Sequence, residues 1–211
     1  YQDNETAIYY ISVENENYEM PAMPKGVEEG IVKGIYKLSS REVKGAKARV
    51  QLFGTGSILR SVLKAQELLA DKYKIASDVW SVTSYTQLRR DAQSIERWNY
   101  LHPTETPKTS YIEQVLSGVE GPFIAASDHV RELPEQLWRY IPGDYFVLGT
   151  DGMGRSETRE ALRRHFEVDA ESVTLAALYR LAKQNVLSMT DVAQAIKDLD
   201  YNPEKINPLF A

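Results

Sequence analysis

The fold follows from one stretch of the chain, Asp144-Tyr-Phe-Val-Leu-Gly-Thr-Asp-Gly-Met-Gly-Arg-Ser-Glu-Thr-Arg-Glu-Ala-Leu-Arg-Arg164. A short apolar run leads into a turn rich in glycine and aspartate, and then into a helical start with Ser156 or Thr158 as the expected cap. This order predicts a strand, a turn and a helix in one unit. Open α/β sheets place ligands and partners in the loop that leaves the carboxyl end of a parallel strand. The turn at Asp151 and Gly152 is therefore a candidate contact site.

The same alternation extends outward from this unit over most of the chain. Apolar runs predict strands at 50–53, 79–82, 123–126 and 145–148, and amphipathic spacing predicts helices at 57–73, 85–100, 133–140, 157–166, 169–184 and 188–199. Ser188 and Asp191 have the spacing of a capping box at the start of the last helix. Strands that alternate with helices predict an α/β fold with a doubly wound, mostly parallel sheet.

The amino-terminal part has a different pattern. The apolar run Ala7-Ile-Tyr-Tyr-Ile-Ser-Val13 predicts a buried strand, and a lone strand is not stable by itself, so residues 1–25 are expected to be the tail of a preceding domain. Residues 26–47 are predicted to form a connecting helix up to Leu38 and then a polar linker. Residues 48–211 are predicted to be the main domain.

Composition limits the classes of function. The 211 residues are 43% hydrophobic and 26% charged, as in an ordinary globular protein. A net charge of -5 argues against a nucleic-acid partner, because nucleic-acid-binding domains usually carry a basic excess. No apolar run approaches the roughly 20 residues of a membrane span, so no membrane partner is expected. The absence of cysteine excludes disulfides and thiolate metal sites, and it fits a cytoplasmic location.

In a parallel sheet the carboxyl ends of the strands share one edge, so their loops are expected to gather into one crevice. Arg155, Arg159 and Arg163 recur at helical spacing and predict a cationic stripe, for which a solvated face is the common explanation and an anionic partner the alternative. The candidate residues of the crevice and its interface are Gly54, Gly56, Ser57, Ser84, Tyr85, Ser127, Asp128, His129, Asp151, Gly152, Arg155 and Arg159.

Two motifs in these loops suggest chemistry without completing it. Phe53-Gly-Thr-Gly-Ser-Ile-Leu59 has the context of a phosphate-cradling turn, but Leu59 replaces the third glycine of a dinucleotide fingerprint, so a plain turn is favoured over an anion or nucleotide site. Ser127-Asp-His129 contains the residue types of a hydrolase triad, but adjacent residues point in different directions, so a helix cap beside a surface histidine is favoured. No residue is predicted to be catalytic, cofactor-binding or metal-binding.

Several long stretches carry a family resemblance. They are Ser12-Val-Glu-Asn-Glu-Asn-Tyr-Glu-Met-Pro-Ala-Met-Pro-Lys-Gly-Val-Glu-Glu-Gly-Ile31, Leu52-Phe-Gly-Thr-Gly-Ser-Ile-Leu-Arg60, Val82-Thr-Ser-Tyr-Thr-Gln-Leu-Arg-Arg-Asp91, Ala126-Ser-Asp-His-Val-Arg-Glu-Leu-Pro-Glu-Gln136 and Leu148-Gly-Thr-Asp-Gly-Met-Gly-Arg-Ser-Glu-Thr-Arg159. They resemble the homodimeric bacterial pyruvate dehydrogenases in their enterobacterial form, from the end of the middle domain through the carboxyl-terminal domain. Met153 stands where a phenylalanine is expected in many relatives.

The resemblance implies a transketolase-like carboxyl-terminal fold and a parent enzyme on the route from glycolysis to acetyl-CoA. Such a parent uses thiamine diphosphate and magnesium to decarboxylate pyruvate and reductively acetylate a lipoyl group. The implied partners are the amino-terminal and middle domains, the second subunit of a homodimer, and the dihydrolipoyl acetyltransferase component.

The resemblance also implies that this part of the parent is not catalytic. The Gly-Asp-Gly…Asn motif that holds magnesium and diphosphate is absent, since Gly143-Asp144 is followed by Tyr145. This chain alone is therefore expected to be inactive, to bind neither cofactor, and to serve dimer and complex assembly. There are two alternatives. One is a small hydrolase with Ser57 or Ser127 as nucleophile. The other is a regulatory anion or nucleotide site in the crevice, centred on Gly54, Gly56, Ser127, Asp151 and Gly152.

Overall fold

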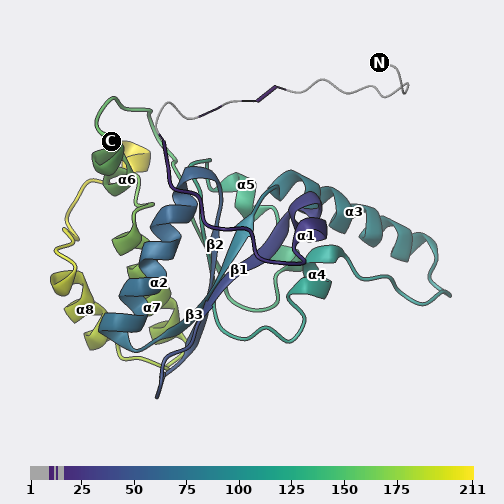
Figure 1. The fold of residues 1–211 in the computed structure, drawn as a ribbon, viewed down its shortest axis with the longest axis horizontal. Helices are drawn as coiled ribbons and strands as arrows, with labels where there is room; N and C mark the ends of the chain where they lie inside the picture. Colours follow the sequence, from purple (N-terminus) through teal and green to yellow (C-terminus); the bar gives the residue numbers. More distant parts are fainter. Residues whose placement is uncertain (1–9, 12, 14–16) are drawn as a thin grey trace.

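The computed structural model describes residues 10–11, 13 and 17–211. Its centre is a five-stranded sheet with the order β1-β3-β2-β4-β5 (Figure 1). The strands are β1 (Ile35–Arg41), β2 (Arg49–Gly54), β3 (Ala76–Val82), β4 (Phe123–Ala126) and β5 (Tyr145–Leu148). β2 pairs in parallel with β3 and β4, β4 pairs in parallel with β5, and β1 is antiparallel to β3. The predicted α/β fold with a mostly parallel sheet is confirmed.

Helices cover both faces of this sheet. They are α1 (Glu28–Lys33), α2 (Leu59–Tyr73), α3 (Tyr85–Leu101), α4 (Tyr111–Val115), α5 (Glu132–Glu135), α6 (Arg159–His165), α7 (Ala170–Lys183) and α8 (Met189–Asp198), with 3-10 turns η1 (Gly56–Ile58), η2 (Trp138–Tyr140) and η3 (Pro208–Phe210). α2, α7 and α8 pack on one face, and α3 and α4 contribute to the core on the other. The predicted helix over 133–140 is split into α5 and η2, and α4 has no counterpart among the predicted helices.

Each face has its own apolar core because successive strand residues point to opposite sides. In β2, Leu52 belongs to the core beneath α2 and α7, and Phe53 belongs to the core beneath α3. Both side chains are fully buried. The Phe53 ring packs edge-on against Phe123 of the neighbouring strand at a centroid distance of 5.8 Å. The alternation of apolar residues along β2 thus joins the two layers of helices through one sheet.

The prediction of a connecting helix up to Leu38 is wrong in its second half. α1 ends at Lys33, because Gly34 adopts a left-handed conformation with φ of 113°, and residues 35–41 form β1 instead. A Cβ atom at Gly34 would lie 2.7 Å from the carbonyl oxygen of Ser84, so only glycine fits this turn. The apolar spacing that suggests a helix is overruled by β3, whose free edge supplies the backbone partners for β1.

The predicted strand at residues 7–13 lies largely outside the described residues. Of its members that are described, Tyr10, Ile11 and Val13 belong to no strand and are 78–94% exposed. Their burial in a strand is therefore not seen in this chain. The assignment of residues 1–25 to a preceding domain stays a prediction.

Two predicted helix starts are confirmed by their hydrogen bonds. Ser188 accepts a hydrogen bond from the Asp191 amide at 3.1 Å, and the Asp191 carboxylate accepts one from the Ser188 amide at 2.9 Å, which completes the capping box of α8. Thr158 accepts from the Ala161 amide at 3.3 Å and so caps α6. Because α6 begins only at Arg159, Arg155 lies in the preceding loop, and the predicted helical stripe that includes Arg155 is wrong.

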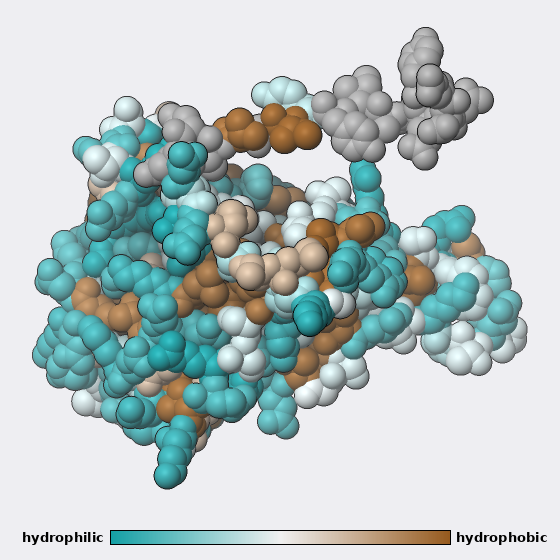
Figure 2. All heavy atoms as spheres, in the orientation of Figure 1, coloured by the Kyte–Doolittle hydropathy of each residue, from teal (hydrophilic) through white to brown (hydrophobic). Residues whose placement is uncertain are grey.

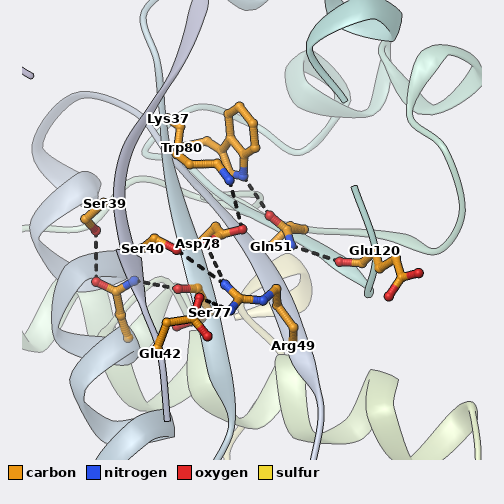
Figure 3. A network of polar contacts seen from close by, with 11 residues as sticks. Lys37, Ser39, Ser40, Glu42, Arg49, Gln51, Ser77, Asp78, Trp80 and Glu120 are labelled. Atoms are coloured by element: carbon orange, nitrogen blue, oxygen red, sulfur yellow. Dashed lines mark hydrogen bonds and ion pairs between the residues drawn. The ribbon is translucent and has the colours of Figure 1, made fainter. Parts of the chain in front are cut away.

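A polar network ties β1 to the sheet at the amino ends of the parallel strands (Figure 3). Its centre is Asp78 of β3, which is 4% exposed. The Asp78 carboxylate accepts hydrogen bonds from Lys37 Nζ at 3.1 Å, from Arg49 Nη1 at 2.7 Å and from the Ser40 hydroxyl. Burial raises the pKa of Asp78, but the bonds from Ser40 and Lys37 and the charges of Lys37 and Arg49 outweigh it, so the pKa lies below its ordinary value.

Neutral side chains continue this network on either side of Asp78. Trp80 Nε1 donates to Gln51 Oε1 at 2.8 Å, and Gln51 Nε2 donates to the carbonyl oxygen of Glu120 at 2.8 Å. On the other side Ser39 donates to Gln66 of α2 at 2.9 Å. Since buried polar groups are costly unless paired, these bonds specify which residues of β1, β2 and β3 face one another.

Candidate functional site

The loops at the carboxyl ends of the parallel strands lie next to one another. Gly54 is level with Ser81 of β3 and with Ala126 of β4, and Ala126 is level with Leu148 of β5. The Thr55 hydroxyl donates to the carbonyl oxygen of Val82 at 2.7 Å and fixes the first two loops together. Strand order thus brings the predicted loops to one edge, and whether this edge binds a ligand stays a prediction.

The turn after β2 faces a carboxylate of the same chain. Gly56 opens η1 with φ of 52°, and a Cβ atom there would lie 3.7 Å from both carboxylate oxygens of Asp128. The Ser57 hydroxyl lies 3.5 Å from Asp128 Oδ2. Gly54 is buried, and a Cβ atom there would approach Leu59 Cα within 2.9 Å, so the glycine serves helix packing. The turn at the start of α2, where the positive end of the helix dipole could attract an external anion, therefore faces the Asp128 carboxylate of the same chain.

The Ser127-Asp-His129 motif does not form a triad. Ser127 is fully buried, and its hydroxyl accepts a hydrogen bond from the backbone amide of His129 at 3.1 Å rather than from the imidazole. Asp128 and His129 are both exposed. Neither Ser127 nor Asp128 is the cap of α5, whose preceding residue is Arg131. The motif is a tight turn, held to the next loop by the Thr150 hydroxyl, which donates to the Asp128 carbonyl oxygen at 2.7 Å.

The loop after β3 supplies a helix cap and a buried tyrosine. The Ser84 hydroxyl accepts from the Gln87 amide at 3.1 Å and caps α3. Tyr85 is 4% exposed, and its hydroxyl has no hydrogen-bond partner among the residues that the structure describes. Burial raises the pKa of Tyr85 far above its ordinary value. Tyr85 belongs to the apolar core beneath α3, so its role is packing.

The glycine-rich loop after β5 is clamped on both sides. Asp151 accepts from the Arg131 amide at 3.0 Å and also binds the Arg131 guanidinium. Burial acts to raise the pKa of Asp151, but these contacts with Arg131 lower it below its ordinary value. Gly152 has φ of 105°, and a Cβ atom there would lie 2.1 Å from the Pro208 carbonyl oxygen. The carboxyl-terminal segment therefore packs directly on this loop.

The remaining candidates, Arg155 and Arg159, do not line the cavity that lies next to α6. Arg155 is exposed and Arg159 is half-buried at the first position of α6. A cavity of about 1150 Å³ lies between α2, α6, the start of α7 and residues 19–22. The charged residues of its lining are Arg60, Lys64, Arg163, Arg164, Glu19, Glu67, Glu160, Asp169 and Glu171. Because both signs alternate in the lining, the cavity has no excess charge that would select an anion.

Candidate metal ligands are not clustered in the part of the chain that the structure describes. Among these residues no group of three or more histidine, aspartate or glutamate side chains could hold a metal ion. Within the same ranges no helix has both the length and the apolar character needed to cross a membrane. The strongest polar cluster, at Asp78, was not among the sequence candidates, although a charged residue inside the buried run 76–82 is a signal that could have identified it.

Comparison with known proteins finds a matching family and several similar sequences. Residues 34–169 match the family described as the transketolase-like TK C-terminal domain. The pyruvate dehydrogenase E1 component of Escherichia coli (strain K12) is 52% identical over 211 residues, which are 100% of this chain and 23% of that protein. The corresponding protein of Pseudomonas aeruginosa is 49% identical over 209 residues, 99% of this chain and 24% of that protein. The chain thus spans about a quarter of the length of the curated relatives it matches.

A solved structure, transketolase from Leishmania mexicana, gives a TM-score of 0.46 with 15% sequence identity, and the match covers 74% of this chain and 19% of that chain.

Proposed function

Because the chain belongs to the family of transketolase-like C-terminal domains, we propose that it is the noncatalytic carboxyl-terminal part of a pyruvate dehydrogenase E1 component. The observation that carries the proposal is the 52% identity to such a protein along the whole of this chain. The resemblance to bacterial pyruvate dehydrogenases found in the sequence is confirmed by this match. The parent would be an oxidoreductase that decarboxylates pyruvate and reductively acetylates the lipoyl group of an acetyltransferase component in the cytoplasm.

The residues of this chain do not fit thiamine diphosphate and magnesium. The best candidate for a diphosphate cradle is the turn at Gly56, and the Asp128 carboxylate lies beside it. A diphosphate bound at this turn would lie next to the Asp128 carboxylate, and the two anions would repel each other. The described residues also lack a carboxylate or histidine cluster for a metal ion. We therefore assign both cofactors to the other domains of the parent, and no step of the reaction to a residue of this chain.

The proposed role of this part is structural. An apolar core covers each face of its sheet. On the amino-terminal segment, by contrast, the side chains of Tyr10, Ile11, Val13, Met20 and Met23 are 58–94% exposed. Exposed apolar side chains in series are typical of surfaces that another domain or subunit covers. The amino-terminal and middle domains and the second subunit of a homodimer are the partners we propose for them.

The test uses the whole parent protein. We expect the full-length protein to decarboxylate pyruvate in the presence of thiamine diphosphate and magnesium, and the separate 211-residue chain to show no turnover. Removing these residues from the parent should shift its sedimentation from a dimer to smaller or aggregated species. A parent without pyruvate decarboxylation, or a truncated parent that stays dimeric and fully active, would contradict the proposal.

A regulatory anion or nucleotide site at the crevice is the second candidate function. The motif Gly54-Thr-Gly-Ser57 at the start of η1 favours it, and the position of Asp128 opposes it. Calorimetric titration of nucleotides and acyl-coenzyme A thioesters distinguishes the regulatory site from the structural role, because a purely structural domain gives no saturable heat. Saturable heat that is lost on substitution of Gly56 would support the regulatory site, and its absence would remove it.

A small stand-alone hydrolase is the third candidate, and it has the least support. The Ser127 hydroxyl is buried and bound to the His129 amide, and Ser57 has only a carboxylate nearby. Labelling of either serine by an acylating activity probe would support a hydrolase, and unlabelled protein would remove this candidate.

A further inference from the structure

Charges on α3 are divided between an inner and an outer side. Both of its acids bind elements of the same chain: Asp91 accepts from the Tyr111 amide at 2.7 Å, and Glu96 binds Arg139 at 2.6 Å. Its three cations, Arg89, Arg90 and Arg97, are all exposed. Within the described part of the chain, none of these three has an ion-pair or hydrogen-bond partner. The helix therefore directs positive charge outward on a protein whose net charge is -5.

The second half of α3 projects beyond the core (Figure 1). The buried residues of the helix are Tyr85, Leu88 and Ala92, all in its first half. We call residues 93–109, the rest of the helix with the loop that follows, the α3 arm; no residue of the arm is buried. At its far end Tyr100 is 66% and Leu101 47% exposed. Figure 2 shows the arm as a protrusion from the body, mostly hydrophilic with scattered apolar residues.

The tip of the arm is nevertheless held in a fixed shape. The Trp98 and His102 rings stack with centroids 4.4 Å apart, and Lys108 Nζ lies 3.6 Å from the Trp98 centroid. Asn99 and the Lys108 backbone exchange two hydrogen bonds of 2.8 Å each. These contacts hold the loop that follows the helix against it, and no residue of the core takes part in them. A surface that is ordered before it binds loses little conformational entropy on binding.

We propose that the exposed arginines of α3, Arg89, Arg90 and Arg97, and the α3 arm together form a docking surface for an acidic polypeptide segment with apolar side chains. The unpaired arginines select negative charge, and Tyr100 with Leu101 provides the apolar contact that strengthens such an interface. A nucleic acid fits less well, because the apolar side chain of Leu101 makes no favourable contact with a phosphate backbone. The inference is independent of the catalytic activity proposed for the parent.

The test measures fluorescence anisotropy of labelled 20-residue probes with the whole protein. The probes are a peptide of alternating glutamate and leucine, a peptide of alternating glutamate and serine, and oligodeoxythymidylate of the same length. We expect the glutamate-leucine peptide to bind most tightly, and its affinity to fall as the salt concentration is raised. The triple variant R89E/R90E/R97E should weaken its binding by about tenfold.

Matched variants separate the arm from a general charge effect. The control K72E/K183E/K197E makes the same net charge change on α2, α7 and α8, and should alter the binding less than twofold. The double variant Y100S/L101S should weaken binding of the glutamate-leucine peptide severalfold and leave binding of the glutamate-serine peptide unchanged. Circular dichroism checks that each variant is folded. Equal losses in the two triple variants, tighter binding of the oligonucleotide, or no binding of either peptide would overturn the proposal.

Discussion

Replacing the Asp78 carboxylate with an amide tests how the antiparallel strand β1 is held to the sheet. In the Asp78→Asn variant the amide nitrogen faces the donors of Lys37 and Arg49, and two cations lose their shared anion. Removing one partner of a fully buried ion pair costs about 3–5 kcal/mol. Here Lys37 is 44% and Arg49 28% exposed, so water replaces part of the lost interaction. We therefore expect the free energy of unfolding to fall by about 2 kcal/mol.

Urea unfolding followed by tryptophan fluorescence measures this loss, and Asp71→Asn is the matched control. Asp71 of α2 binds Arg41 of β1 at 2.7 Å, but the two side chains are 66% and 42% exposed. An exposed pair of this kind contributes about 0–1 kcal/mol, so its loss should be the smaller one. Equal effects of the two substitutions, or a change at Asp78 below about 0.5 kcal/mol, would refute the reasoning.

The contribution of Asp78 to the free energy of unfolding should depend on pH. The pKa of Asp78 in the folded protein lies below its ordinary value of 3.8, so the ionised form stabilises the fold. This stabilisation is complete above the unfolded-state pKa and is lost as the pH falls through the lower, folded-state pKa. The difference between the wild type and Asp78→Asn should be constant from about pH 5 to 8 and shrink below about pH 4. A difference that grows as the pH falls would contradict the assigned contacts.

Two further substitutions test local features with matched controls. Gly152→Ala should destabilise the protein more than Gly143→Ala, because both glycines have a left-handed φ but only the Cβ atom at Gly152 would collide with the Pro208 carbonyl. Gly143→Ala should lower the free energy of unfolding, measured by thermal unfolding, by about 1–2 kcal/mol. Equal losses in the two variants would argue against the contact with the carboxyl-terminal segment. Ser188→Ala should lower the free energy of unfolding in urea by about 1 kcal/mol through loss of the α8 cap, whereas Ser156→Ala in the loop before α6 should change it by less than about 0.5 kcal/mol. A neutral Ser188→Ala would mean that the capping box contributes nothing.

The sequence alone determined the elements whose signals are local. The apolar run at Val50 predicted β2, because a buried strand needs only a few consecutive apolar residues. Ser188 and Asp191 predicted the start of α8, because a capping box is completed within four residues. The alternation of strands and helices was enough for the α/β class. The long matches to a known family were likewise visible without coordinates.

Only the tertiary structure decided what depends on residues far apart in the chain. Residues 35–41 carry apolar spacing that fits a helix, yet they form a strand because β3 offers an unpaired edge. Asp128 lies beside Ser57 because β4 is placed next to β2, a neighbour relation that no local pattern contains. Local periodicity sets which face of an element is apolar, whereas strand pairing and side-chain approach arise from contacts that form only when the whole sheet is assembled.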